Sequence, residues 1–261
     1  MISFPNAKIN LGLSIVSKRE DGYHNIESCF YPIPWYDCLE VIEAASFSFS
    51  SYGLDIPGDS SSNICVKAYE TLRSDFDLPP VAIHLLKNIP MGAGLGGGSA
   101  DGAFTLVLLN DLFELNLTTK QLESYALKLG SDCPFFIQNQ PVIASGRGEI
   151  LAPTSIDLSG HFLAIHNPEI HVSTKEAYSG IIPSMPQKGI DELLQSPILQ
   201  WQGQLINDFE KSIFNNFPEI AQLKQKMHDA GAIYSSMTGS GSTVYGIFKE
   251  KTNEKWRWIS L

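Results

Sequence analysis

The sequence IPMGAGLGGGSADGAF, which spans residues 89–104, places five glycines among the seven residues from Gly92 to Gly98. The whole chain holds 21 glycines in 261 residues, so this cluster marks a local demand for unusual dihedrals or very close approach. A β-like run, Val81–Leu86, leads into it, and Ser99–Phe113 spaces apolar residues at helical intervals. A strand, a glycine turn and a helix N-terminus offer free N–H groups to phosphate. The stretch predicts a phosphate-binding loop, with a tight structural turn as the alternative.

The loop lacks residues that define the common phosphate motifs. Gly92, Gly94 and Gly97 fit the G-x-G-x-x-G spacing of dinucleotide-binding folds. In those folds a carboxylate ends a second strand about 20 residues later, whereas Asp111 and Glu114 lie in a helical pattern here. No glycine precedes Lys-Ser or Lys-Thr as in a Walker loop, and the D-F-G signature of protein kinases is missing. A nicotinamide-dependent oxidoreductase stays open as an alternative on these three glycines.

Composition indicates a folded chain large enough for two domains, with 43% hydrophobic and 18% charged residues. Acidic residues outnumber basic ones by 28 to 18, and a net charge of −10 disfavours partners such as nucleic acid or an anionic membrane. No run of apolar residues reaches membrane-spanning length, and no secretory leader pattern stands at the N-terminus. Four cysteines show no C-x-x-C spacing. We expect a reduced, soluble, cytoplasmic protein.

The order of patterns predicts an α+β fold in two domains, residues 1–152 and 153–261. Alternation from Ala7 to Val41 and from Phe47 to Leu54 predicts β-hairpins. Capping boxes at 118–121 and 173–176 predict two helix starts. In the second domain we expect a strand at 162–166, a helix that begins at Pro218, and two strands flanking residues 238–242.

The segment PMGAGLGGGS, residues 90–99, resembles the phosphate loop of the GHMP kinases, the superfamily of galactokinase, homoserine kinase, mevalonate kinase and phosphomevalonate kinase. Further segments resemble this superfamily in order along almost the whole chain: Pro5–Leu11, Arg19–His24, Gly130–Phe135, Asn207–Glu210 and Met237–Ser242. The Asp-Gly-Tyr-His sequence at 21–24 is typical of the branch that phosphorylates a cytidine diphosphate-linked alcohol in the non-mevalonate route to isoprenoids. The resemblance implies a ribosomal protein S5 domain 2-like N-terminal domain and a ferredoxin-like C-terminal domain.

The same resemblance implies which residues bind ATP. Asn63 aligns with a position at the adenine, although an Asn in a Ser-rich turn is often only a local cap. The family usually has two serines where this chain has Ser99 and Ala100, so a contact made by the second hydroxyl must come from Ser99 or elsewhere. The remaining loop residues implied at ATP are Pro90, Met91, Gly92, Ala93, Gly94, Leu95, Gly96, Gly97 and Gly98.

Phosphoryl transfer to an alcohol needs positioning, charge neutralisation and a base near the hydroxyl. The resemblance implies that Asp132 accepts the substrate proton, and that Lys8 keeps Asp132 ionised while offsetting charge on the moving phosphoryl group. The residues alone leave a solvated lysine and a turn-forming aspartate as alternatives. The metal implied is Mg²⁺, which arrives with the nucleotide and takes few protein ligands.

The resemblance also implies a pocket for cytosine. Tyr23 and His24 would bind the base, because an aromatic face stacks on it and an imidazole reaches its edge. Tyr178, after Thr174, would cover the other face, and Asn10 would contact substrate near Lys8. Hairpin packing is the alternative for Tyr23 and His24.

Two further alternatives concern the class of protein. Another GHMP kinase, of the homoserine or mevalonate type, would lack the Asp-Gly-Tyr-His segment. A ligand-binding module without catalysis on the same fold is disfavoured by the presence of both Lys8 and Asp132.

Overall fold

The structure, a computed structural model, describes all residues from 1 to 261. The chain forms two compact units of three segments each. The first unit contains residues 1–7, 35–91 and 96–140, and the second contains residues 8–34, 92–95 and 141–261. The second unit combines the N-terminal hairpin with residues 92–95 and 141–261, and the sequential division at residue 152 stays a prediction.

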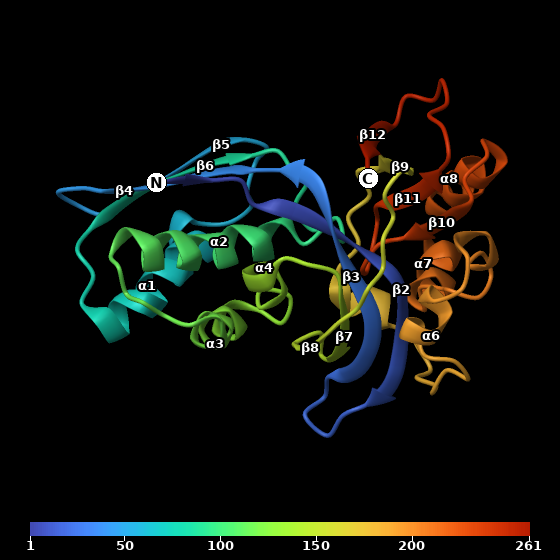
Figure 1. Cartoon of the computed structure of the whole chain (residues 1–261), viewed down its shortest axis with the longest axis horizontal. Helices are drawn as coiled ribbons and strands as arrows, with labels where there is room; N and C mark the ends of the chain where they lie inside the picture. Colours follow the sequence, from blue (N-terminus) through green and yellow to red (C-terminus); the bar gives the residue numbers. More distant parts are fainter. The chain divides into compact units, whose positions relative to one another are not determined.

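The first unit is a four-stranded sheet packed against helices (Figure 1). The strand order is β1-β4-β6-β5. Strand β4 pairs antiparallel with both β1 and β6. Helix α2 begins ten residues after β6, at the glycine cluster. The strands are β1 (Ile2–Ser3), β4 (Cys38–Glu43), β5 (Ser48–Gly53) and β6 (Val81–Lys87), and the helices are η1 (Ser60–Ser62), α1 (Ile64–Phe76), α2 (Gly97–Leu112), α3 (Thr119–Leu129) and α4 (Phe135–Gln138).

Strand β5 runs parallel to β6 and lies at the edge of this sheet. The expectation that Phe47–Leu54 forms a hairpin with the preceding strand is therefore wrong. The chain leaves β5, passes through η1 and α1, and returns as β6 between β5 and β4, which is the crossover that parallel neighbours require. Local alternation identifies a strand, but its partner is decided by the helix that follows.

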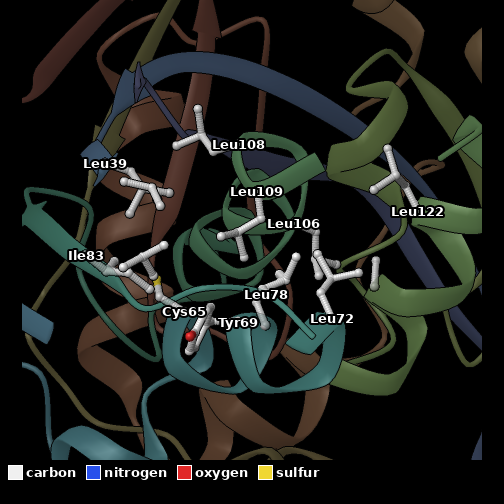
Figure 2. Close-up of a cluster of buried hydrophobic side chains, with 14 of the residues drawn as sticks. Leu39, Cys65, Tyr69, Leu72, Leu78, Ile83, Leu106, Leu108, Leu109 and Leu122 are labelled. Atoms are coloured by element: carbon white, nitrogen blue, oxygen red, sulfur yellow. The ribbon is translucent and has the colours of Figure 1, made fainter. Parts of the chain in front are cut away.

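One apolar cluster joins the sheet and helices of the first unit (Figure 2). In β4, Leu39 and Val41 alternate inward with period two and are fully buried. Burying each such side chain stabilises the fold by roughly 1.5–3 kcal/mol. Facing helices contribute Cys65, Tyr69 and Leu72 from α1, Leu106, Leu108 and Leu109 from α2, and Leu122 from α3.

The second unit contains two four-stranded sheets, in the orders β2-β3-β7-β8 and β10-β11-β9-β12. An apolar cluster between the second sheet and its helices includes Ala164, Phe209, Ile213, Met227 and Val244. The strands are β2 (Asn6–Lys18), β3 (His24–Tyr36), β7 (Val142–Gly146), β8 (Ile150–Pro153), β9 (Phe162–His166), β10 (Tyr234–Met237), β11 (Val244–Phe248) and β12 (Arg257–Ser260). The helices are α5 (Thr174–Tyr178), α6 (Ile190–Leu194), η2 (Ile198–Gln200), α7 (Phe209–Asn216) and α8 (Pro218–Asp229).

Predicted helix starts are confirmed where a side chain caps them. Thr118 and Gln121 form a reciprocal capping box at α3. Ser173 accepts a hydrogen bond from the Glu176 backbone N–H at α5, and Pro218 occupies the first turn of α8. No helix in the chain combines the length and the apolar character needed to cross a membrane.

Candidate active site

The glycine loop connects strand β6 to helix α2 through three left-handed residues. Gly92, Gly94 and Gly96 have φ values of 63°, 76° and 71°, a region that side chains other than glycine rarely adopt. Gly96 is the N-cap of α2 and has no side chain to satisfy the first N–H groups of the helix. The predicted strand, glycine turn and helix are confirmed, and they give the free N–H groups that a phosphate requires.

Packing within the protein leaves no room for a side chain at two of the loop glycines. A Cβ on Gly94 would overlap the carbonyl oxygen of Thr238, and one on Gly97 would lie 2.8 Å from Cγ2 of Ile89. A Cβ on Gly98 would make only an ordinary contact, 3.6 Å from Cε of Met91. Nothing in the protein therefore obstructs a Cβ at Gly98. At Gly94 and Gly97 the close approach that the sequence predicted is made by the protein's own Thr238 and Ile89, and contact of these two glycines with ATP stays a prediction.

A cavity of about 350 Å³ opens beside the start of α2 in the first unit. Asn63, Met91, Gly98 and Ser99 from the predicted nucleotide set line it. Asn63 also caps α1, because its Oδ1 accepts a hydrogen bond from the Cys65 N–H at 2.9 Å. The local-cap alternative is thus correct, yet the same residue lines the cavity. Ala93, Leu95 and Ala100 are buried, so any contact of these three with ATP would be through their backbone.

In the second unit, Lys8 and Asn10 belong to a buried polar network on β2. The Lys8 ammonium donates to Asn10 Oδ1 at 2.6 Å and lies 4.8 Å from the centre of the Phe30 ring. Asn10 Nδ2 donates to Ser28 Oγ, and the Asn10 backbone N–H donates to Thr238 Oγ1. Because both residues are almost fully buried, the solvated-lysine alternative is wrong for Lys8.

The network also holds the first half of the glycine loop. Thr238 Oγ1 lies 3.0 Å from the carbonyl oxygen of Gly94, to which it donates, and the Lys8 N–H donates to the Leu95 carbonyl. Thr238 is fully buried and also contacts Asn10 Oδ1. The sequence placed Thr238 in a matching segment without giving it a role. Its role here is to fix the loop against β2.

Asp132 lies half-buried in the turn between α3 and α4. The next residue, Cys133, is buried and forms a hydrogen bond with the Ser99 hydroxyl in the first turn of α2. Burial raises the pKa of the Cys133 thiol to about 12, so it stays protonated at neutral pH. The bond places the turn of Asp132 beside the second half of the glycine loop.

Two of the predicted cytosine residues, His24 and Tyr178, are in contact in the second unit. His24 stacks on Tyr178, with ring centroids 4.7 Å apart and an interplanar angle of 17°. Burial lowers the pKa of His24, and the nearby Lys18 lowers it further, so the imidazole is neutral at pH 7. A base between these two rings would need roughly 7 Å, two stacking distances, so it cannot lie between His24 and Tyr178 as they stand.

Tyr23 keeps a free aromatic surface at the tip of the β2–β3 hairpin. Its side chain is 57% exposed, and the Arg147 guanidinium lies 5.0 Å from its ring centroid. Thr174 is exposed at the first position of α5. The placement of the base against Tyr23 and Tyr178 remains a prediction.

A cluster of three buried charged residues behind the cavity was not predicted from the sequence. The Lys87 ammonium lies 2.5 Å from Asp37 Oδ2 and 2.7 Å from Asp101 Oδ2, and all three side chains are buried. A lysine that ends an apolar strand directly before a glycine loop was the available signal. The two partners, 50 and 14 residues away, gave none.

The chain matches family models over both halves. Residues 63–146 match the GHMP kinases N terminal domain, and residues 191–255 match the GHMP kinases C terminal model. Both are kinase families, so the nicotinamide interpretation of the loop glycines is wrong.

Among curated proteins, the chain is 53% identical to 4-diphosphocytidyl-2-C-methyl-D-erythritol kinase of Cytophaga hutchinsonii, over 96% of this chain and 93% of that protein. It is 46% identical to the protein of the same name from Parabacteroides distasonis, over 98% and 94%. A crystal structure of 4-(cytidine 5'-diphospho)-2C-methyl-D-erythritol kinase superposes with a TM-score of 0.82 at 30% identity, covering 95% of this chain and 90% of that one. Homoserine kinase from Cytophaga hutchinsonii, at 16% identity and a TM-score of 0.62 over 94% and 85%, shares the fold.

Proposed function

Because the chain belongs to the GHMP kinase family, we propose that it transfers the γ-phosphoryl group of ATP to the 2-hydroxyl of 4-diphosphocytidyl-2-C-methyl-D-erythritol. The observation that carries this proposal is the 53% identity, over 96% of the chain, to a curated kinase named for that substrate. The chain has the two-domain α+β fold of the family, as the sequence predicted. Its place is in isoprenoid biosynthesis by the non-mevalonate route, and four free cysteines fit the reducing cytoplasm.

ATP enters the cavity lined by Asn63, Met91, Gly98 and Ser99, with its phosphates at the N-terminus of α2. The free N–H groups and the positive end of the helix dipole neutralise phosphate charge there. Mg²⁺ would enter with ATP. Because this ion prefers oxygen ligands and keeps several water molecules, few side chains of the protein are needed to hold it. When bound, the ion would supply positive charge that offsets the negative charge developing on the phosphates in transfer.

Asp132 accepts the proton of the substrate hydroxyl while that oxygen forms its bond to the γ-phosphorus and the bond to the β-γ bridging oxygen of ADP breaks. Lys8 offsets the negative charge of the carboxylate and of the transferring group. Asn10 holds the Lys8 ammonium by accepting its hydrogen bond at 2.6 Å. In a loose transition state most of the catalysis comes from such positioning and charge stabilisation.

The cytidine group binds on the exposed ring of Tyr23, with neutral His24 at the base edge. Arg147 lies by that ring at 5.0 Å, so one face carries a cation and the other remains for a base. Tyr178 holds His24 in place by stacking. Binding energy from the distant base positions the reacting hydroxyl, which raises turnover as well as affinity.

The test is ADP formation with ATP, Mg²⁺ and four separate acceptors: the cytidyl substrate, 2-C-methyl-D-erythritol 4-phosphate, homoserine and mevalonate. We expect kcat/KM for the cytidyl substrate to exceed the other three by at least about 100-fold, since losing the cytidine removes positioning energy. If homoserine or mevalonate turned over as well as the cytidyl substrate, the protein would be a GHMP kinase of another type. No ADP with any acceptor, despite ATP binding, would favour the non-catalytic ligand-binding module.

A further inference from the structure

Lys8 and Asn10 lie on strand β2, and the neighbouring strand β3 carries Ser28 (Figure 1). Because side chains two residues apart in a strand share one face, Lys8 and Asn10 point the same way. The Asn10 amide contacts the Lys8 ammonium on its own strand and the Ser28 hydroxyl on β3. Ser28 is fully buried, and Asn10 and Lys8 are 1% and 3% exposed, so bulk water does not replace a hydrogen bond lost within this network.

The direction of each hydrogen bond in the network follows from its two ends. The Lys8 ammonium can only donate, so the Asn10 atom 2.6 Å from it is the carbonyl oxygen. The Gly12 carbonyl can only accept, so the Ser28 hydroxyl, 2.6 Å away, donates its one proton there. Asn10 Nδ2, 2.8 Å from Ser28 Oγ, then donates to a lone pair of that oxygen. Ser28 is therefore the acceptor that faces the Asn10 amide.

The Ser28 hydroxyl helps to decide which end of the amide faces Lys8. An amide turned end for end would place Nδ2 against the ammonium and Oδ1 against Ser28 Oγ, whose proton stays on Gly12. A donor would then face a donor, and an acceptor would face an acceptor. Hydrogen bonds left unmade in a buried network carry the desolvation cost of both groups. Ser28 thus keeps Oδ1 directed at the ammonium.

The backbone of Asn10 is fixed by other residues. Its N–H donates to Thr238 Oγ1 at 3.0 Å, and its carbonyl oxygen accepts from the Tyr245 hydroxyl at 2.7 Å. Thr238 and Tyr245 are both fully buried. Removal of the Ser28 hydroxyl therefore frees the amide group of Asn10 and leaves the strand around it anchored.

We propose that Ser28 is a positioning residue for phosphoryl transfer, which acts through the Asn10 amide to hold the Lys8 ammonium in one place. This inference rests on the proposed role of Lys8, whose charge offsets that of the transferring group. Stabilisation by a charge is largest when the charge is already in place before the reaction, because no free energy is then spent on moving it. Ser28 itself contacts neither nucleotide nor acceptor, and its contribution is the geometry of Lys8.

Ser28→Ala removes the acceptor of Asn10 Nδ2 and is the first test. We expect kcat to fall at least about 5-fold, because the amide turns toward another acceptor and the ammonium loses its fixed partner. KM for ATP should change little, since the residues that line the proposed ATP cavity belong to the first unit and are unaltered. Ser28→Thr keeps a hydroxyl on the same atom and suits a strand, so it should recover most of the lost turnover.

Ser235→Ala is the matched control for the loss of a buried serine hydroxyl. Ser235 lies on strand β10 of the same unit and is 1% exposed, and its hydroxyl donates to the Lys224 carbonyl. Its contacts do not include Lys8 or Asn10. A fall in kcat of Ser235→Ala equal to that of Ser28→Ala would mean a general loss of packing and would overturn the proposal.

A double-mutant cycle tests whether Ser28 acts through Asn10. Asn10→Leu keeps the approximate size of the side chain and removes the amide. In that background Ser28→Ala should lower kcat by less than about 2-fold, because no amide is left to orient. An equal fold loss with and without the amide would show that Ser28 acts independently of Asn10, and the proposal would fail.

Hydrogen exchange measured by NMR gives a readout that does not need turnover. In wild type we expect the Asn10 Nδ2 protons to exchange with solvent far more slowly than those of the exposed Asn215. Ser28→Ala should make the Asn10 protons exchange at least about 5-fold faster, and Ser28→Thr should restore slow exchange. Equal exchange of Asn10 and Asn215 in wild type would refute the network without any variant.

The outcomes separate this inference from the proposed function. If Ser28→Ala does not fold, Ser28→Cys takes its place with the same expected directions, because a thiol forms weaker hydrogen bonds than a hydroxyl. If wild type forms ADP from the cytidyl substrate and the Ser28 variants match its kcat, only this inference fails. If wild type forms no ADP with any acceptor, the proposed function fails, whatever the exchange rates are.

Discussion

Asp132 is the residue on which the proposed chemistry depends most directly. Asp132→Asn keeps the size of the side chain but cannot accept the hydroxyl proton, so we expect turnover to fall about 100-fold or more. ATP affinity should stay near wild type, since the cavity at Asn63 and Ser99 is unchanged. Steady-state kinetics and nucleotide titration check both, with Asp111→Asn as the exposed control. A variant that retained more than about a tenth of wild-type turnover would remove Asp132 from the role of base.

Substitution of Tyr23 tests the proposed recognition of the substrate's base. Stacking on an aromatic ring is worth roughly 1–3 kcal/mol per base, so Tyr23→Ala should raise KM for the cytidyl substrate about 5- to 150-fold. KM for ATP should change little. Tyr52 is 58% exposed against 57% for Tyr23, which makes Tyr52→Ala a control of equal exposure outside the pocket. Equal kinetics for the two variants would mean that Tyr23 only packs on its hairpin.

Alanine substitutions at two neighbouring glycines separate the structural role of the loop from its proposed role in ATP binding. Gly97→Ala puts a Cβ 2.8 Å from Ile89 on β6, so we expect a lower melting temperature. Gly98→Ala finds room 3.6 Å from Met91 and should leave the melting temperature unchanged or slightly raised, because alanine favours helix. Its methyl group enters the lining of the nucleotide cavity, so ATP affinity should fall several-fold while affinity for the cytidyl substrate holds. Equal ATP affinity in Gly98→Ala and wild type would mean that the phosphates bind elsewhere.

These elements show where sequence reasoning succeeds and where it stops. The helix after the loop, the capping box at Thr118 and the strand at 81–86 are local patterns, and the structure confirms each. The partner of β5 was predicted wrongly because period-two alternation gives a strand but not its neighbour. The need for glycine at positions 94 and 97 depends on Thr238 and Ile89, and nothing within the loop sequence reveals those contacts.

Across the chain, the fold was predictable because six short segments match one family in order, and the two family models confirm it. The same segments contain most of the candidate residues, and Asn63, Ala100, Thr174 and Tyr178 lie outside them; the roles of all remain proposals. The contacts that could not be predicted join residues far apart in the sequence. Lys87 is one of 18 basic residues, and only the folded chain shows that its ammonium is buried between two carboxyl groups.

That buried cluster makes the stability of the protein depend on pH in a direction opposite to most carboxyl groups. The pKa of Asp101 is about 8 in the folded protein, and about 3.9 is usual for an unfolded chain. Between these values the folded state holds a proton that the unfolded state has released, so this group's contribution to stability falls as pH rises from about 4 to about 8. Asp101→Asn has no such proton. We expect the melting temperature of the variant relative to wild type to rise between pH 5 and pH 8 by at least about 2–4 °C, which corresponds to about 1 kcal/mol at this chain length. Asp111→Asn should track wild type at both pH values. A difference between Asp101→Asn and wild type that is constant across this range would mean that Asp101 is ionised throughout, which contradicts a raised pKa for this group.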